Sequence, residues 1–151
     1  MKRIALVVLI AIIALALVAC GGPREVLSVE EFTSRMEAEG FSVEDLTHVW
    51  QDPFVETFLL VETGDFEMQF FVFESEADAR ASFSHIKGLF EDARGSSSSH
   101  TETNIANFNR FRQTTDGRFE AITRVEDTLV VAQTSAENRA DVNAVFDLLG
   151  Y

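Results

Sequence analysis

The sequence predicts an α+β domain with a mostly antiparallel sheet and three helices, in the element order αβββαβββα. Two observations predict this class. Three amphipathic segments each begin with a serine, at Ser28, Ser75 and Ser135. The runs between these segments are rich in Phe, Val and Thr and are interrupted by glycine or Asp-Gly. Strands joined by such tight turns pair as antiparallel neighbours, which favours α+β over a parallel sheet.

The three helices are predicted from their serine caps and their glycine ends. Each serine is followed, three positions later, by an acidic or amide residue: Glu31, Asp78 and Asn138. A serine N-cap accepts a hydrogen bond from an otherwise unpaired amide, and an acidic residue in the first turn meets the positive end of the helix dipole. Gly40, Gly95 and Gly150 follow the apolar stripes and predict the helix ends.

The first group of strands is predicted around Gly64. Residues 53–63 and 65–73 flank this glycine and are rich in Phe, Val and Thr, which is the pattern of a β-hairpin. A preceding strand at 41–49 has a weaker pattern.

The strand predicted at 65–73 is apolar on both faces. Phe71 and Phe73 lie on one face, and the other face carries Phe66, Met68, Phe70 and Val72. A strand of this kind is not solvated on either side. Either helices cover both faces of the sheet, or one face forms a hydrophobic groove or a homodimer surface.

The second group of strands is predicted at 103–115, 118–125 and 128–134. The turns between them are Asp116-Gly117 and Glu126-Asp127. The Asp-Gly pair favours a tight hairpin because both central residues adopt positive φ easily.

The N-terminus has the pattern of an export signal. Lys2 and Arg3 precede an unbroken apolar run from Ile4 to Ala19, and small residues follow. As a helix this run would span about 24 Å, less than the roughly 30 Å of hydrocarbon in a bilayer. A cleaved signal peptide at residues 1–19 is therefore favoured over an anchor that spans the membrane.

The end of this run resembles a bacterial lipobox. Leu17, Val18 and Ala19 precede Cys20, the single cysteine of the chain. The resemblance implies that the signal is cut before Cys20 and that its sulfur carries a diacylglyceryl group, with further acylation by chains such as palmitate. Two or three chains give stable anchoring, whereas one binds a membrane marginally. The remaining alternatives are an ordinary secretory signal and an uncleaved anchor.

Cleavage would leave 132 residues, enough for one domain. The predicted organisation is a signal peptide at 1–19, a lipidated cysteine and tether at 20–27, and a single α+β domain at 28–151. All fourteen phenylalanines lie beyond the signal, so a core forms without disulfides.

The acidic balance excludes one class of partner. The mature chain would carry 10 basic and 25 acidic residues, a formal charge of −15. Nucleic acid is excluded because affinity for phosphate backbones depends on Lys and Arg that release counterions. An anionic lipid surface repels such a domain, so the domain is expected to stand off the membrane.

The sequence lacks the common catalytic and metal-binding motifs. The mature part contains no G-x-S-x-G and no S-x-x-K, and GSSSSH at 95–100 is predicted to be a flexible loop. His48, His85 and His100 have no spacing typical of a zinc site. No catalytic residue, no metal and no cofactor is predicted.

Two further features have open interpretations. Trp50 precedes Pro53 in a predicted connection, where it either covers the edge of the core or contacts a partner. The densest basic set of this acidic chain either binds an anionic group or pairs with local carboxylates; it consists of Arg110, Arg112, Arg118 and Arg124.

The mature chain resembles a group of small bacterial lipoproteins of unknown function, of Gram-positive type. The resemblance rests on the lipobox, on a first helix like SVEEFTSRMEAEGFSVEDLT, on FFVFESEADARASF, on NFNRFRQTTDGRFEAITRVEDTLVVA and on the terminal LLGY. It implies no enzyme activity and supplies no catalytic residues. Phenylalanine at 108 and 111, where tyrosine is usual in such proteins, and the scarcity of lysine depart from the pattern.

The sequence thus predicts a lipid-anchored, non-catalytic binding or interaction module on the extracytoplasmic face of the cell membrane. It would be held to the membrane through Cys20 and would bind a protein, a small apolar ligand or a second copy of the chain. The candidate contact surface is Trp50, Phe71 and Phe73.

Two alternatives from other classes remain. The first is a cell-envelope enzyme with a dispersed site built from the three histidines and carboxylates. The second is an acidic structural or sensory lipoprotein that presents its surface to cations or cationic polymers.

Overall fold

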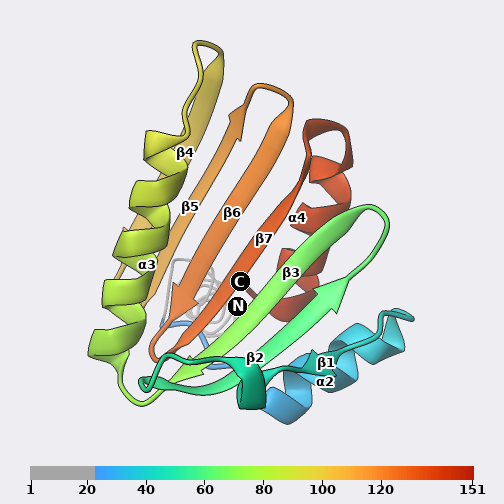
Figure 1. Ribbon diagram of the computed structural model, residues 1–151, viewed down its shortest axis with the longest axis vertical. Helices are drawn as coiled ribbons and strands as arrows, with labels where there is room; N and C mark the ends of the chain where they lie inside the picture. The colour runs from blue at the N-terminus through green and yellow to red at the C-terminus, as the bar shows by residue number, and fades with distance from the viewer. Residues whose placement is uncertain (1–22) are drawn as a thin grey trace, which may run out of the picture.

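The computed structural model describes residues 23–151 and confirms the predicted α+β class, with three α-helices and seven strands in that part of the chain (Figure 1). The helices are α2 (Val29–Ala38), α3 (Glu76–Asp92) and α4 (Arg139–Leu149). The strands are β1 (Glu44–Asp45), β2 (Val55–Glu62), β3 (Phe66–Phe73), β4 (Ser98–Ile105), β5 (Phe108–Thr115), β6 (Arg118–Val125) and β7 (Thr128–Ser135). The predicted signal peptide, with Leu17, Val18 and Ala19, and the predicted lipid attachment site Cys20 lie outside the described residues.

The strands form one sheet in the order β1-β2-β3-β7-β6-β5-β4, and all neighbouring pairs are antiparallel. Hairpins account for most of the pairs because tight turns join consecutive strands. At the predicted Asp116-Gly117 turn both residues have positive φ, 47° and 80°. The pairing of β3 with β7, with Phe70 opposite Val130, joins the two halves of the chain at the centre of the sheet.

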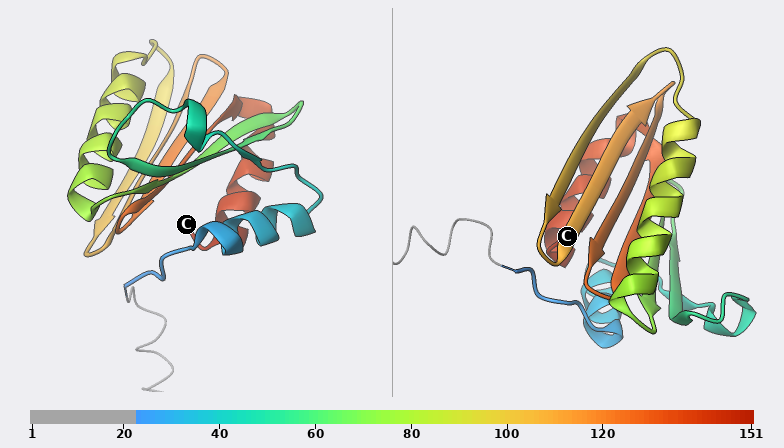
Figure 2. Two further views of the ribbon diagram at one scale, coloured as in Figure 1. Left: turned by 60° about the horizontal axis from the view of Figure 1, so that its bottom comes forward. Right: turned by 90° about the vertical axis from the view of Figure 1, so that its left-hand side faces the viewer.

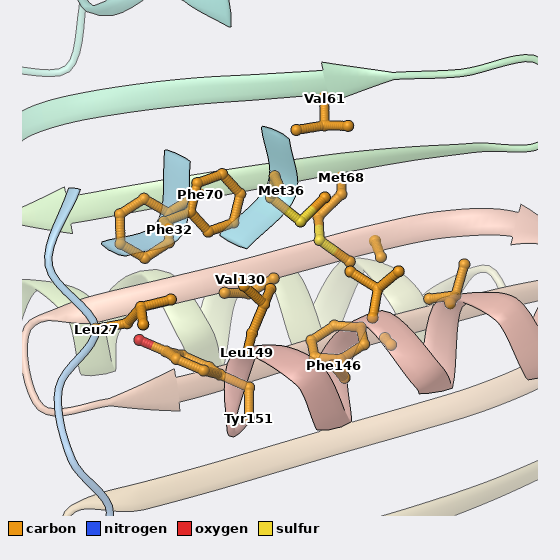
Figure 3. Close-up of a cluster of buried hydrophobic side chains, with 14 of the residues drawn as sticks. Leu27, Phe32, Met36, Val61, Met68, Phe70, Val130, Phe146, Leu149 and Tyr151 are labelled. Carbon is orange, nitrogen blue, oxygen red and sulfur yellow. The ribbon is translucent and has the colours of Figure 1, made fainter. Parts of the chain in front are cut away.

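Helices cover both faces of the sheet, which explains the strand that is apolar on two sides. Helices α2 and α4 lie on one face and α3 lies on the other (Figure 2). On the α2–α4 face the ring of Phe32 stacks on Phe70 with centroids 4.5 Å apart, and Met36, Phe146 and Leu149 fill the space around them (Figure 3).

Two of the predicted serine caps are present as hydrogen bonds. The hydroxyl of Ser28 accepts from the amide of Glu31, whose carboxylate accepts from the Ser28 amide, so α2 begins with a complete capping box. The hydroxyl of Ser75 accepts from the amide of Asp78 at the start of α3.

The third predicted helix start is displaced. Ser135 makes no side-chain cap, and a 3-10 turn, Ala136–Asn138, follows it. Helix α4 begins at Arg139 and ends at Gly150, whose φ of 85° is the left-handed conformation that glycine adopts without strain. The prediction at Ser135 was wrong because one turn of 3-10 helix precedes the α-helix.

The run predicted as one strand at 103–115 is two strands. The chain turns between β4 and β5 at Ala106, which has φ of 31°. A residue other than glycine rarely adopts this conformation, so the composition gives no sign of the turn. The described order therefore has four strands after α3 instead of three.

The predicted loop at 95–100 is partly strand. β4 begins at Ser98, opposite Thr115 of β5, and its backbone pairs with β5 up to Ile105. The loop prediction was wrong for these residues because backbone pairing, which is independent of side-chain polarity, orders the segment. At the other end of the sheet, the strand predicted at 41–49 shrinks to β1 and a 3-10 turn, Thr47–Val49.

The packed part of the chain extends N-terminally to Arg24, before the predicted domain start at residue 28. The Arg24 amide donates to Oδ1 of Asn107 at 3.1 Å, and its guanidinium donates to the carbonyl of Gly150 at 2.5 Å. Leu27 is buried in the α2–α4 core beside Tyr151 (Figure 3). Within residues 23–151 no helix is both long enough and apolar enough to cross a bilayer.

Candidate functional site

A groove of about 710 Å³ lies on the α3 face of the sheet. Strands β3 and β7 form its floor, α3 forms one wall, and the segment after the 3-10 turn at Thr47–Val49 forms the other wall. Its volume is typical of pockets that hold small organic ligands. The wall from α3 carries Ala81, Ser82, His85, Ile86, Leu89 and Phe90.

The groove exists because α3 covers only part of this face. Phe83 and Phe90 of α3 belong to the same cluster as Phe111 and Ile122, so the helix packs toward β5 and β6. In Figure 1 this helix lies on the β4 side of the sheet, away from β2 and β3. The apolar side chains of β3 and β7 on this face are therefore left as a floor beside the helix.

The structure brings the three predicted contact residues together in this groove. Trp50, Phe71 and Phe73 all line it. The Trp50 ring lies 4.6 Å from the Phe58 ring and 5.3 Å from the Phe71 ring, and Phe58 stacks on Phe71 at 4.7 Å. These spacings are typical of favourable aromatic pairs, so the residues form one continuous aromatic wall.

The rim of the groove exposes large apolar side chains. Trp50 keeps 42% of its surface exposed, and Leu89 on the opposite wall keeps 54%. Val49 and Phe54, which flank Trp50 in the chain, are also exposed, at 56% and 51%. Exposed apolar residues scattered singly are ordinary, but Trp50 and Leu89 line two walls of one groove and mark a contact surface.

A buried carboxylate lies in the floor. Glu120 is 4% exposed, and its Oε2 accepts a hydrogen bond of 2.6 Å from Nε2 of Gln113. The same amide nitrogen donates to the carbonyl of Phe90, and the amide oxygen of Gln113 accepts from Arg94 at 3.1 Å. Both N–H groups of the Gln113 amide are therefore used, and the hydrogen bond to Glu120 among the described residues goes to Oε2 and leaves Oε1 free.

The charge of the lining is negative. Asp52 and Glu120 supply carboxylates, His85 supplies an imidazole, and no lysine or arginine of residues 23–151 lines the groove. The remaining polar lining comes from amides and a hydroxyl, in Gln69, Gln133 and Ser82. An apolar cavity with carboxylates in it favours a ligand with an apolar body and a polar end that donates hydrogen bonds or carries positive charge.

The three histidines of the alternative enzyme site lie on three different elements. His48 is in the 3-10 turn, His85 in α3 and His100 in β4, and all three are exposed. His85 lines the groove, whereas the His100 ring packs against Phe111 at 6.0 Å. Ser82 and His85 share the α3 wall, and the described residues include no hydrogen bond between them and no cluster of three metal-ligating side chains.

The predicted basic set divides into different environments. Arg124 is fully buried, donates to Oδ1 of Asn109 at 2.7 Å and pairs with Glu76 at 3.2 Å. Arg118 is exposed at the start of β6. Arg110 and Arg112 lie on the opposite face of the sheet from Arg124, and within residues 23–151 neither forms an ion pair.

Several groove residues were not predicted. Glu120 was detectable as a charge in the middle of an apolar strand, RFEAITRV, where a buried carboxylate signals a site. His85 and Leu89 belong to the exposed side of an amphipathic helix in the sequence pattern. Their role depends on where α3 crosses the sheet, which the sequence does not show.

Comparisons with known proteins give no family. No protein-family model matches the chain, and no curated protein matches it. Among solved structures, the fold is similar to a GTP-binding regulator from Thermotoga maritima, with a TM-score of 0.48 and 13% identity over 85% of this chain and 91% of that chain. It is also similar to the extracellular domain of PknH from Mycobacterium tuberculosis, with a TM-score of 0.36 and 10% identity over 82% of this chain and 69% of that chain.

Proposed function

We propose that this chain is a lipid-anchored lipoprotein on the extracytoplasmic face of the cell membrane that binds a small apolar ligand without chemically converting it. The observation that carries the proposal is the groove between α3 and the aromatic wall at Trp50. The lipobox at Leu17–Cys20 supports the location, and the resemblance to small lipoproteins of unknown function agrees with it.

The ligand is identified by the chemistry of the lining. Its body is flat or branched and apolar, because it packs between the Trp50–Phe71 wall and Leu89. Its polar end carries a positive charge or a hydrogen-bond donor, because Oε1 of Glu120 has a free lone pair and the described residues that line the groove include no lysine or arginine. Burying a carboxylate beside a cation costs less than burying it alone.

The polar groups of the groove are suited to orienting a bound ligand. Ser82 and His85 lie on its α3 wall, and Glu120 is held in place in its floor through Gln113.

The test is competition for the groove, with the full chain purified in non-ionic detergent. Nile red, an apolar and uncharged dye, is expected to bind with increased fluorescence. Two naphthalene probes of equal size, naphthylmethylammonium and naphthoate, then compete for the site. The cationic probe is expected to displace the dye at a concentration at least about fivefold lower, because two carboxylates line the groove.

Matched variants locate the binding. Leu89→Ser is expected to weaken dye binding about tenfold, because an apolar contact worth roughly 1–2 kcal/mol is lost. Ile105→Ser is the control, since Ile105 has similar exposure at 43% and lies at the end of β4, outside the groove. Glu120→Gln keeps an acceptor for Gln113 and is expected to reduce the preference for the cationic probe, because Asp52 remains as the second carboxylate. Equal effects of the Leu89 and Ile105 variants would contradict the proposal.

A further inference from the structure

On the α2–α4 face, opposite the groove, three residues have buried polar atoms that lack hydrogen-bond partners. These atoms are Nε and Nη2 of Arg112, Oγ1 of Thr123 and Oδ1 of Asn143. The residues come from β5, β6 and α4. The Arg112 guanidinium lies 5.2 Å from the ring of Phe146, and Phe146 follows Asn143 by about one turn of α4. Thr123 is the cross-strand neighbour of Arg110. The unpaired atoms therefore gather between the sheet and α4.

The unpaired edge of Arg112 has a specific geometry. Nε and Nη2 form one side of the planar guanidinium, and their two parallel N–H groups match two oxygens of one carboxylate or phosphate. A buried donor without a partner costs about 1–3 kcal/mol, more when it is charged, so native proteins satisfy such groups with water, an ion or a ligand. The edge is thus arranged to receive an oxyanion.

Further arginines surround this position. Arg24 and Arg110 lie over the same ring, that of Phe108, with distances of 4.1 and 5.7 Å to its centroid. Arg139 of α4 lies 5.5 Å from the ring of Phe119 in the same core. The ion pairs of the described residues include none of the four arginines. The chain has about twice as many acidic as basic residues, so carboxylate partners are plentiful. Arginines that lie together without such partners are unfavourable unless an anion binds among them.

The chain's own carboxylates do not neutralise Arg112. Burial, with a further contribution from the like charge of Arg110, lowers the pKa of Arg112 to about 10. Asp147 acts in the opposite direction and stabilises the charged guanidinium, but it lies beyond the 4.0 Å of an ion pair. The Nε and Nη2 edge of the half-buried Arg112 is therefore enclosed, and the charge of the guanidinium is only partly compensated.

We propose that these residues form a binding site for a phosphate-type oxyanion, held by the Nε and Nη2 edge of Arg112, with the hydroxyl of Thr123 as an additional donor and Arg110 and Arg139 supplying charge. The oxyanion comes either from free phosphate or from a phospholipid headgroup. Arg24 lies four residues after Cys20, so at most about 14 Å of extended chain would separate it from an anchor at that cysteine. The oxyanion site itself does not depend on the proposed groove ligand.

The test follows the Arg112 side chain directly. The full chain, labelled with ¹⁵N-arginine and purified in non-ionic detergent, is titrated with inorganic phosphate at constant ionic strength. The Arg112 Nε–H resonance, assigned by its loss in Arg112→Gln, is expected to shift and saturate. A second titration uses bicelles of phosphatidylglycerol in phosphatidylcholine, which separates headgroup binding from binding of free phosphate. A saturable shift in either titration supports the proposal.

Variants show whether Arg112 binds an added oxyanion or pairs with a carboxylate of the chain. Arg112→Lys keeps the charge but lacks the two-donor edge, and its missing resonance also assigns Arg112 if Arg112→Gln fails to fold. In this variant binding is followed through the Nε–H resonances of Arg110 and Arg139, and it is expected to weaken about tenfold. Asp147→Asn is expected to tighten binding several-fold, because it removes a competing negative charge. Arg118→Gln, an exposed arginine of the adjacent strand, is the control and should change nothing. The proposal would be overturned if neither phosphate nor anionic bicelles gave a saturable shift. It would also be overturned if the Arg112 resonance responded to Asp147→Asn but not to added anion, because Asp147 would then be the partner of Arg112.

Discussion

Tyr151 is the last residue of the chain and one of its most buried side chains, at 1% exposed. Its hydroxyl shares a hydrogen bond with that of Thr128, and its backbone amide donates to the carbonyl of Phe146 at 2.9 Å. The ring packs beside Leu27 and Leu149 (Figure 3). A single side chain therefore joins the N-terminal segment, the end of α4 and the β6–β7 turn.

Tyr151 is expected to ionise at a higher pH in the folded protein than in the unfolded chain. Burial raises its pKa to about 12, against an ordinary value of about 10. Because it is the single tyrosine, the ultraviolet absorbance of phenolate reports this group alone. We expect the absorbance to rise near pH 12 in the folded chain and near pH 10 in denaturant. A folded-state midpoint near pH 10 would contradict the burial of the ring.

The same shift predicts how stability depends on pH. Because the pKa of Tyr151 is higher in the folded chain, neutral Tyr151 contributes fully to the free energy of unfolding below about pH 10. This contribution is lost between pH 10 and 12, at up to about 1.4 kcal/mol per pH unit. Arg112 opposes this, since its lowered pKa makes the folded state lose a proton first. The free energy of unfolding should therefore be compared between wild type and Tyr151→Phe. Their difference is expected to shrink above pH 10.

At the scale of elements, the capping box of α2 gives a second prediction. Ser28→Ala removes the acceptor for the Glu31 amide and is expected to lower the free energy of unfolding by about 1 kcal/mol. Ser34→Ala is the matched control, because Ser34 is exposed in the middle of the same helix and alanine has the higher helix propensity. Urea denaturation checks both. Equal losses in the two variants would contradict the assigned cap.

The elements that could be predicted are those whose residues determine their own local structure. Ser28 and Ser75 cap helices, and Asp116-Gly117 forms a tight turn, because these interactions need only a few neighbouring residues. Strand β4 was missed at Ser98 and Ser99 because it is a polar edge strand, ordered by its pairing with β5 and not by a hydrophobic pattern. Local signals cannot report such pairing.

The sequence predicted the aromatic residues of the candidate groove but not its α3 wall or Glu120. Phe71 and Phe73 of the aromatic wall were predicted because their strand is apolar on both faces. Trp50 was predicted because it lies in a connection before Pro53. Glu120 comes from β6, which lies far from Trp50 in sequence, and reaches the groove because β3 and β7 pair at the centre of the sheet. The distances between α3 and these strands arise from packing and have no sequence signal.

At the scale of the whole molecule, the proposed anchor predicts a change of location. Cys20→Ser in the full chain removes the sulfur that would be acylated. We expect the wild-type chain to incorporate alkyne-palmitate and to sediment with membranes, and the variant to lose the label and leave the membrane fraction. A wild-type chain with a free thiol and an intact N-terminal signal would contradict the proposed location, while the groove would still need its own test.

The two proposed sites lie on opposite faces of one sheet and have opposite charge preferences. The groove on the α3 face presents Asp52 and Glu120 among aromatic side chains, whereas the α2–α4 face presents Arg110 and Arg112. Because the central strands β6 and β7 contribute to both faces, a variant in their buried residues would alter both sites. Variants at Leu89 or Arg112 change one site and leave the other as an internal control.

The most direct measurement is the indole N–H resonance of Trp50, which is single because the chain has one tryptophan. On titration of the full chain with naphthylmethylammonium, we predict a saturable shift of this resonance whose midpoint concentration rises about tenfold in Leu89→Ser and is unchanged in Ile105→Ser. An indole resonance that does not move at saturating probe, or whose midpoint is the same in both variants, would contradict the claim that this groove binds a ligand.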